Sequence, residues 1–232
     1  MMGLLLDQPY NCVHCGKSFM KDKTLVAHMC ERKRRALQKD EKRVQAGYMA
    51  FNRFWSLTQG AKKSKTYDEF ADSSYYNAFV KFGGFVNNIN PLYPDKFIDY
   101  VIKSGVKLDH WCRDEIYEKY LREIIKVEPV ESAVQRTLKT MMEWGDANNA
   151  NFAHYFKYVS LSRAVHDISN GNISPWVILN SVTGQSLVRS MSDEQLNMIA
   201  PVFDVPYWLR RFKELPADVA LVKEICNEIG LK

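Results

Sequence analysis

Apolar side chains recur at the spacing of amphipathic helices along most of this chain. The spacing predicts helices over residues 94–104, 109–126, 152–168 and 217–229, and a further helix that begins at Pro129. No segment shows the sustained apolar–polar alternation of a strand. The pattern therefore predicts an all-α helical domain over residues 67–232.

Turn residues separate these segments. NGNISPW at 170–176 combines a helix stop at Gly171 with a new start, in which Ser174 is the N-cap and Pro175 lies in the first turn. Ser192 and Gln195 have the spacing of a capping box. Gly83-Gly84 is expected to interrupt a helix, and GDANNAN at 145–151 is expected to form a turn.

The segment just after residue 66 is unusually aromatic and lies next to several lysines. Aromatic rings interleaved with lysines can stack on bases while the lysines contact phosphates. At helical spacing, however, such rings more often form a core, and core packing is the favoured interpretation. The segment contains Tyr67, Phe70, Tyr75, Tyr76, Phe79, Phe82 and Phe85, beside Lys62, Lys63, Lys65 and Lys81.

The first 66 residues have a different character. Residues 31–45 predict a highly charged helix with few apolar positions, which is solvated or bound to a partner. Residues 47–57 predict a short aromatic helix, and QGAKKSKT at 59–66 is typical of a linker. The chain is thus expected to comprise residues 1–30, a connecting part at 31–66, and the helical domain at 67–232.

The positive charge is concentrated near the amino terminus. Residues 16–46 contain ten Lys or Arg and four Asp or Glu, whereas the rest of the chain is nearly balanced. Such a cluster suits the phosphates of DNA or RNA, although it could also be a solvated helix face paired with Glu31, Asp40 and Glu41. The candidate nucleic-acid-binding residues are Lys17, Lys21, Lys23, Arg32, Lys33, Arg34, Arg35, Lys39, Lys42 and Arg43.

Three potential metal ligands have a regular spacing in the same region. Cys12 and Cys15 are separated by two residues, and His28 follows Cys15 after twelve. Small-core positions agree with this spacing, namely Tyr10, Phe19 and Leu25. In all these positions the segment resembles the C2H2 zinc fingers, which implies a small ββα unit that binds one structural Zn²⁺. By the same resemblance, the base-reading positions would be Lys21, Lys23, Thr24 and Ala27.

The segment departs from that family after His28. The family places its fourth ligand three to five residues further on, where this chain has Arg32, Lys33 and Arg34. Cys30 is the nearest soft donor, but two residues along a helix turn a side chain by about 200°. We therefore expect the helix to end near His28, so that Cys30 becomes the fourth ligand; water or Glu31 is the alternative. A closed site of this kind is structural and not catalytic.

Several functional classes lack support in the sequence. The longest apolar runs are far shorter than the roughly 18 residues of a membrane span, and the first residues lack the pattern of a secretory signal. The cysteine pattern suits metal binding in a reducing compartment. There is no P-loop, nucleophile elbow or HExxH motif, so no catalytic residue and no enzyme are expected. An intracellular, cytoplasmic protein is expected, located in the host cytoplasm if the protein is viral.

Two further segments resemble phage proteins. The passage from the finger directly into a basic helix, LVAHMCERKRRALQKDE, is similar to small uncharacterised proteins of large tailed phages. The segment YFKYVSLSRAVHDISNGNISPWVIL resembles phage helicase-loading proteins, without assigning any functional residue. The sequence predicts a non-enzymatic accessory protein that binds nucleic acid and contacts a protein partner in replication, repair or transcription. The alternative is an interaction or assembly factor whose finger is purely structural.

Overall fold

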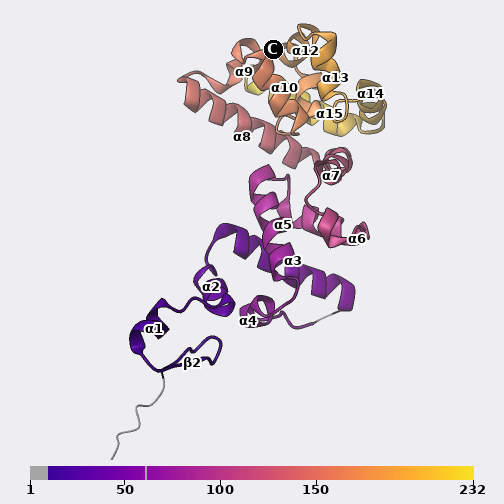
Figure 1. Cartoon of the computed structure of the whole chain (residues 1–232). Helices are drawn as coiled ribbons and strands as arrows, with labels where there is room; N and C mark the ends of the chain where they lie inside the picture. Colours follow the sequence, from indigo (N-terminus) through magenta and orange to yellow (C-terminus); the bar gives the residue numbers. More distant parts are fainter. Residues whose placement is uncertain (1–9, 61) are drawn as a thin grey trace, which may run out of the picture. The chain divides into compact units, whose positions relative to one another are not determined.

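The computed structural model describes residues 10–60 and 62–232, and it is mostly helical (Figure 1). Within these ranges two short strands pair near the amino terminus, and all other regular elements are helices. The predicted fold class, mostly α with a small ββα unit first, is confirmed. The chain forms two compact units, residues 1–116 and 117–232.

The first unit begins with a hairpin and continues through helices of increasing length. The two strands pair antiparallel, with Tyr10 opposite Phe19. The elements are β1 (Tyr10–Asn11), β2 (Ser18–Phe19), α1 (Asp22–Ala27), α2 (Glu31–Leu37), α3 (Lys42–Gln59), α4 (Tyr67–Ala71), α5 (Tyr76–Ile89), α6 (Pro94–Lys103), η1 (Leu108–His110) and α7 (Asp114–Val127), which extends past the boundary between the units.

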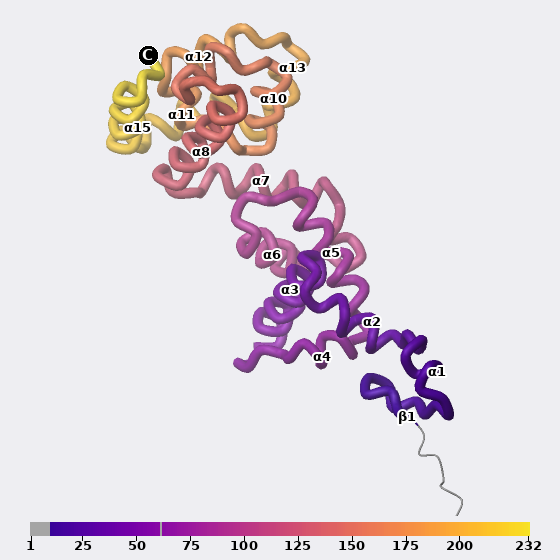
Figure 2. Tube along the Cα trace, turned by 90° about the vertical axis from the view of Figure 1, so that its left-hand side faces the viewer, coloured from indigo at the N-terminus to yellow at the C-terminus, as the bar shows by residue number. Residues whose placement is uncertain are grey.

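Helices α3 and α5 lie side by side and form the centre of the first unit (Figure 2). They approach so closely that a Cβ atom at Gly47 would lie 2.6 Å from the Phe79 carbonyl oxygen, and one at Gly83 would meet the α3 backbone even more closely. The expected interruption at Gly83-Gly84 is therefore wrong, because α5 runs through both residues. The aromatic core around the crossing comprises Phe51, Phe70, Phe79 and Phe82, all buried.

The predicted basic helix over 31–45 is also wrong, because the segment forms two helices. Helix α2 ends at Leu37 and contacts α4, whereas α3 starts at Lys42 and packs against α5. The aromatic segment 47–57 is the continuation of α3, whose buried face begins at Val44. The turn between the two helices is held by Gln45, whose side-chain amide donates to the Lys39 carbonyl oxygen at 2.6 Å.

The segment expected to be a linker, 59–66, lies inside the first unit. The Tyr48 hydroxyl donates to the Lys65 carbonyl oxygen at 2.6 Å, and the Lys65 N–H donates to the Asn52 side chain at 2.7 Å. Thr66 and Glu69 then form a capping box that starts α4. The division between the two compact units follows Ile116, and the domain boundary at residue 66 stays a prediction.

The second unit is built from helices connected by short turns. The predicted features at 170–176 and 192–196 are confirmed, since Gly171 has a positive φ and Ser174 and Ser192 both cap helices. The elements after α7 are α8 (Val130–Asn148), η2 (Phe152–His154), α9 (Tyr155–Tyr158), α10 (Leu161–Ser169), α11 (Pro175–Asn180), α12 (Val182–Arg189), α13 (Asp193–Ile199), α14 (Val205–Glu214) and α15 (Pro216–Glu228).

Two expectations for the second unit are corrected. Segment 145–151 is not simply a turn, since α8 continues through Gly145 to Asn148. Segment 152–168 is divided among η2, α9 and α10, so His154 and His166 do not share one helix. Among the described residues, no helix has both the length and the apolar character needed to cross a membrane.

Candidate metal centre and basic surface

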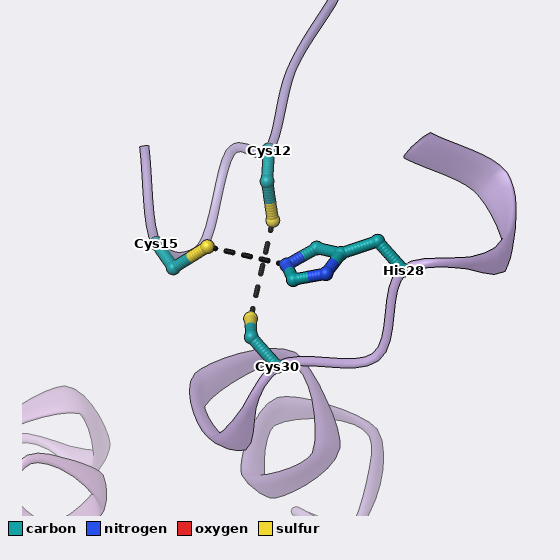
Figure 3. A group of neighbouring side chains, drawn as sticks. All are labelled: Cys12, Cys15, His28 and Cys30. Atoms are coloured by element: carbon teal, nitrogen blue, oxygen red, sulfur yellow. Dashed lines mark hydrogen bonds between the residues drawn. The ribbon is translucent and has the colours of Figure 1, made fainter. Parts of the chain in front are cut away.

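The β1–β2 hairpin positions the first two cysteines of the candidate metal centre. The Cys12 N–H donates to the Lys17 carbonyl oxygen at 2.9 Å, and the Gly16 N–H donates to the Cys12 carbonyl oxygen at 2.8 Å. Gly16 has a φ of +73°, a conformation that glycine adopts without steric cost. With this tight turn, the Cys12 and Cys15 sulfurs both point toward the space between them, His28 and Cys30 (Figure 3).

The end of α1 allows the other two side chains to converge on the same point. Helix α1 ends at Ala27, and His28 has an extended conformation with φ −69° and ψ 122°. The chain can then turn at Met29, so that Cys30 does not follow the rotation of a continued helix. The expectation that the helix ends near His28 is confirmed. Cys30 is also the N-cap of α2, and its sulfur accepts the Lys33 N–H at 3.4 Å.

The four side chains form a compact group. Their ligand atoms all lie within 4.8 Å of one another, and Figure 3 shows them pointing toward a common centre. The Cys12 and Cys30 sulfurs are 4.0 Å apart, and the Cys15 sulfur is 3.3 Å from His28 Nε2. Ligands of one tetrahedral Zn²⁺ would be about 3.8 Å apart for two sulfurs and about 3.6 Å apart for sulfur and nitrogen. The residues therefore fit a single metal ion.

The acidity of the thiols agrees with this fit. Burial disfavours the Cys12 thiolate, but the N–H groups of Cys15 and His14 and the thiols of Cys15 and Cys30 together outweigh burial, so the pKa of Cys12 is lowered. The Lys17 N–H favours the Cys15 thiolate, yet burial and the adjacent Cys12 and Cys30 oppose it, so the pKa of Cys15 is raised. Three neighbouring thiolates thus repel one another unless a cation lies between them.

The small core around the site is only partly shielded from solvent. Cys12 is buried, whereas Tyr10 is 45% exposed. The Phe19 ring packs on the His28 ring with centroids 4.8 Å apart, and Leu25 is half-buried. With so little apolar burial, a metal ion would contribute most of the stability of this segment.

The predicted nucleic-acid-binding residues differ in how much of each is exposed. Lys33 and Arg35 are half-buried, and Lys33 Nζ donates to the His28 carbonyl oxygen at 3.1 Å. The others are exposed: Lys17, Lys21, Lys23, Arg32, Arg34, Lys39, Lys42 and Arg43.

Several of the exposed arginines already have acidic partners. Arg32 pairs with Asp72 at 2.8 Å, and Arg34 pairs with Glu31 at 2.9 Å. Arg43 donates to Glu41 at 2.8 Å. Exposed pairs of this kind contribute at most about 1 kcal/mol each, so phosphates can compete for these guanidinium groups.

Arg35 has a structural role that its sequence context did not reveal. Its guanidinium lies 4.3 Å from the centre of the Tyr76 ring and donates to the Ala71 carbonyl oxygen and to Glu31. Its own carbonyl oxygen accepts the Tyr67 hydroxyl at 2.5 Å. Because all these partners except Glu31 lie in α4 and α5, Arg35 fixes α2 to the helices that follow.

The remaining candidates fall mostly in the core. The preference for core packing of the aromatic segment is supported, because Phe70, Tyr76, Phe79 and Phe82 are buried, although Tyr75 is 56% exposed. Of the residues outside the cluster that could carry chemistry, Cys226 is buried, and Cys112 and His110 are half-buried.

Comparisons of the chain with protein-family models, with curated proteins and with solved structures found no match. The likeness to a zinc finger therefore depends on residues 10–30 and their geometry. The similarity to phage proteins stays a prediction.

Proposed function

We propose that Cys12, Cys15, His28 and Cys30 hold one structural Zn²⁺. Three thiolates and one imidazole are a donor set that zinc prefers, and the spacing of their ligand atoms suits a tetrahedral ion. With all four positions supplied by the protein, the ion would stabilise the fold and leave no open position for a substrate.

We further propose that the chain is a non-enzymatic accessory protein that binds DNA or RNA through residues 16–46. The main support is the concentration of positive charge there, on a segment where eight of the ten cations are exposed. A surface of this kind attracts phosphates with little sequence preference, and its affinity falls as salt rises.

The helical domain is the proposed site of protein contacts. Several large apolar side chains are exposed in the second unit, where folding within that unit does not bury them. A partner in replication, repair or transcription would cover them. The most exposed are Val127, Tyr158, Val182 and Met198.

A second candidate function is an interaction or assembly factor in which the metal centre only supports the fold. The observation that favours it is the pairing of Arg32, Arg34 and Arg43 with nearby acids. If those pairs persisted in solution, the basic segment would have less charge to offer a phosphate backbone.

A salt titration separates the two candidates. The full-length, zinc-loaded protein would be titrated with fluorescent duplex and single-stranded oligonucleotides between about 50 and 200 mM salt. Replacing Lys17, Lys21 and Lys23 by Gln should reduce the slope of log affinity against log salt by about 2 to 3. The matched control replaces three exposed lysines of the second unit by Gln: Lys139, Lys213 and Lys223.

The two functions predict different outcomes. Binding that weakens steeply with salt, and that responds to the finger lysines but not to the control lysines, supports the nucleic-acid function. Absence of binding, or binding that salt does not affect, would contradict it and favour the assembly factor.

A further inference from the structure

A pocket of about 500 Å³ lies beside the crossing of α3 and α5. Its walls come from the first turn of α3, from one face of α5 and from the segment that precedes α7. Its volume is within the range of small-ligand pockets, about 300 to 1,000 Å³. The lining residues that matter here are Arg43, Asn77, Lys81, Gly84, Phe85 and Asn88.

The lining is suited to an anionic ligand with an aromatic part. Arg43 and Lys81 are exposed cations from two different helices, and among the described residues that line the pocket none is an Asp or Glu. Arg43 donates its Nε–H to Glu41 but has further N–H donors. Asn77 and Asn88 add amide donors and acceptors, and the half-buried Phe85 offers an apolar ring.

Gly84 is the second observation that points to a ligand. A glycine inside a helix costs about 0.5 to 1 kcal/mol relative to alanine. Gly83 is required by the close approach of α3, but Gly84 is not: a Cβ there would make only an ordinary 3.8 Å contact with Arg43 Cβ. Packing therefore does not explain Gly84, whereas the close approach of a ligand to the α5 backbone would.

We propose that this pocket binds one unpaired nucleotide of a single-stranded nucleic acid. This inference rests on the proposed nucleic-acid function, and it specifies the strand type. Arg43 is both a predicted phosphate-binding cation and a residue of the pocket wall, so a strand bound at Arg43 would also reach the pocket. Lys81 contacts the phosphate, Phe85 packs against the base, and the two asparagines bond to the base edge, which a duplex does not leave free.

Cys112 provides a direct reporter, since it also lines the pocket. Burial raises the pKa of its thiol, while the Lys81 ammonium opposes that rise. Cys226 is only 2% exposed, and the remaining three cysteines belong to the metal centre. The rate at which iodoacetamide alkylates Cys112 in the zinc-loaded full chain at pH 8.5 therefore measures access to the pocket, and peptide mass spectrometry identifies the modified residue.

The probes are a twelve-nucleotide unstructured strand, the duplex of the same sequence, and adenosine monophosphate. We expect the single strand to slow alkylation of Cys112 at least severalfold, and the duplex to leave the rate unchanged. Gly84→Leu, which fills the pocket without adding charge, should abolish the protection by the strand. A thermal melt of this variant checks that the fold persists.

Lys81→Gln gives a second test that does not depend on filling the pocket. Loss of one phosphate contact should reduce the slope of log affinity against log salt by about 0.7. If the variant and the wild type bind equally at 1 M salt, the variant then binds about fivefold more weakly than the wild type at 0.1 M salt. Lys223→Gln removes the same charge from an exposed position in the second unit and should leave single-strand binding unchanged.

The outcomes separate this inference from the proposed function. If the strand binds with steep salt dependence, yet Cys112 is not protected and both pocket variants bind normally, the pocket assignment is wrong and the basic segment alone binds. If no nucleic acid binds, both proposals fail. Protection by adenosine monophosphate but not by the strand would overturn the strand assignment, because the pocket would then take free nucleotides.

Discussion

Cys30 has two separable roles, and one substitution can distinguish them. Its sulfur belongs to the four-residue cluster proposed to hold zinc, and it also caps α2 by accepting the Lys33 N–H. Cys30→Ser keeps an oxygen that caps a helix well but removes the thiolate. Cys30→Ala removes both, so the pair of variants measures each role.

The two roles differ greatly in the stabilisation free energy that each contributes. Structural zinc in small fingers is worth about 10 to 16 kcal/mol of coupled folding free energy, and that energy depends on the complete ligand set. Loss of an N-cap costs about 1 kcal/mol. Cys30→Ser should therefore lose nearly all of the folding free energy that zinc contributes. Cys30→Ala should be only about 1 kcal/mol less stable than Cys30→Ser.

The measurements are zinc per chain after dialysis against a chelator of moderate affinity, and hydrogen exchange of the α2 amides. Wild type should retain one zinc per chain, and both Cys30 variants should lose it and exchange faster over residues 31–37. Cys112→Ser is the matched control, because Cys112 is a partly buried cysteine outside the cluster.

One result would refute the ligand assignment. If Cys30→Ser keeps one zinc with wild-type affinity, Cys30 does not bind the metal, and the fourth ligand is water or Glu31. If zinc is lost but the two variants exchange at equal rates, the cap contributes nothing measurable.

Three further predictions concern the first unit. Gly83→Ala should lower the free energy of unfolding by about 1 to 3 kcal/mol, because the added methyl overlaps the α3 backbone. Gly84→Ala should leave the free energy of unfolding unchanged or raise it, and urea denaturation measures both variants. Arg35→Lys should cost about 1 to 3 kcal/mol in the same assay, because lysine cannot both stack on Tyr76 and bond to the Ala71 carbonyl oxygen. Lys65 and the Thr66 N–H lower the pKa of Glu69 from 4.5 to about 2, so Glu69 stabilises the folded state above pH 4.5, and that stabilisation is lost as the pH falls toward 2. Glu69→Gln should therefore be less stable at pH 7 and equal to wild type near pH 2, and a pH series of thermal melts checks this.

The convergence of Cys12, Cys15, His28 and Cys30 could be predicted because its determinants are local. The two cysteines, the histidine and the small-core positions lie within twenty residues, where chain geometry alone limits what can converge. Even the departure from the usual spacing was informative, since Cys30 can reach the cluster only if the helix ends first. The observed end of α1 at Ala27 meets that requirement.

The helix break between Leu37 and Lys42 could not be predicted from local sequence, because it contains neither proline nor glycine. It exists because two separate surfaces bind the two halves: α4 contacts α2, and α5 packs on α3. The role of Gly83 was hidden for the same reason. Its partner, Gly47, lies 36 residues earlier, and only the folded structure brings them together.

These contacts give α2 a specific position between the metal centre and the rest of the first unit. Seven residues are too few to form a stable helix alone, so α2 depends on what holds its two ends. Its first end is held by Cys30, and its last turn is held by Arg35 through Tyr67, Tyr76 and Ala71. Removal of the proposed metal ion should therefore release the first end only, leaving the α3–α5 crossing intact. Arg32, Lys33 and Arg34 would then lose their fixed spacing to Arg35, and the proposed phosphate binding would weaken without any change in charge.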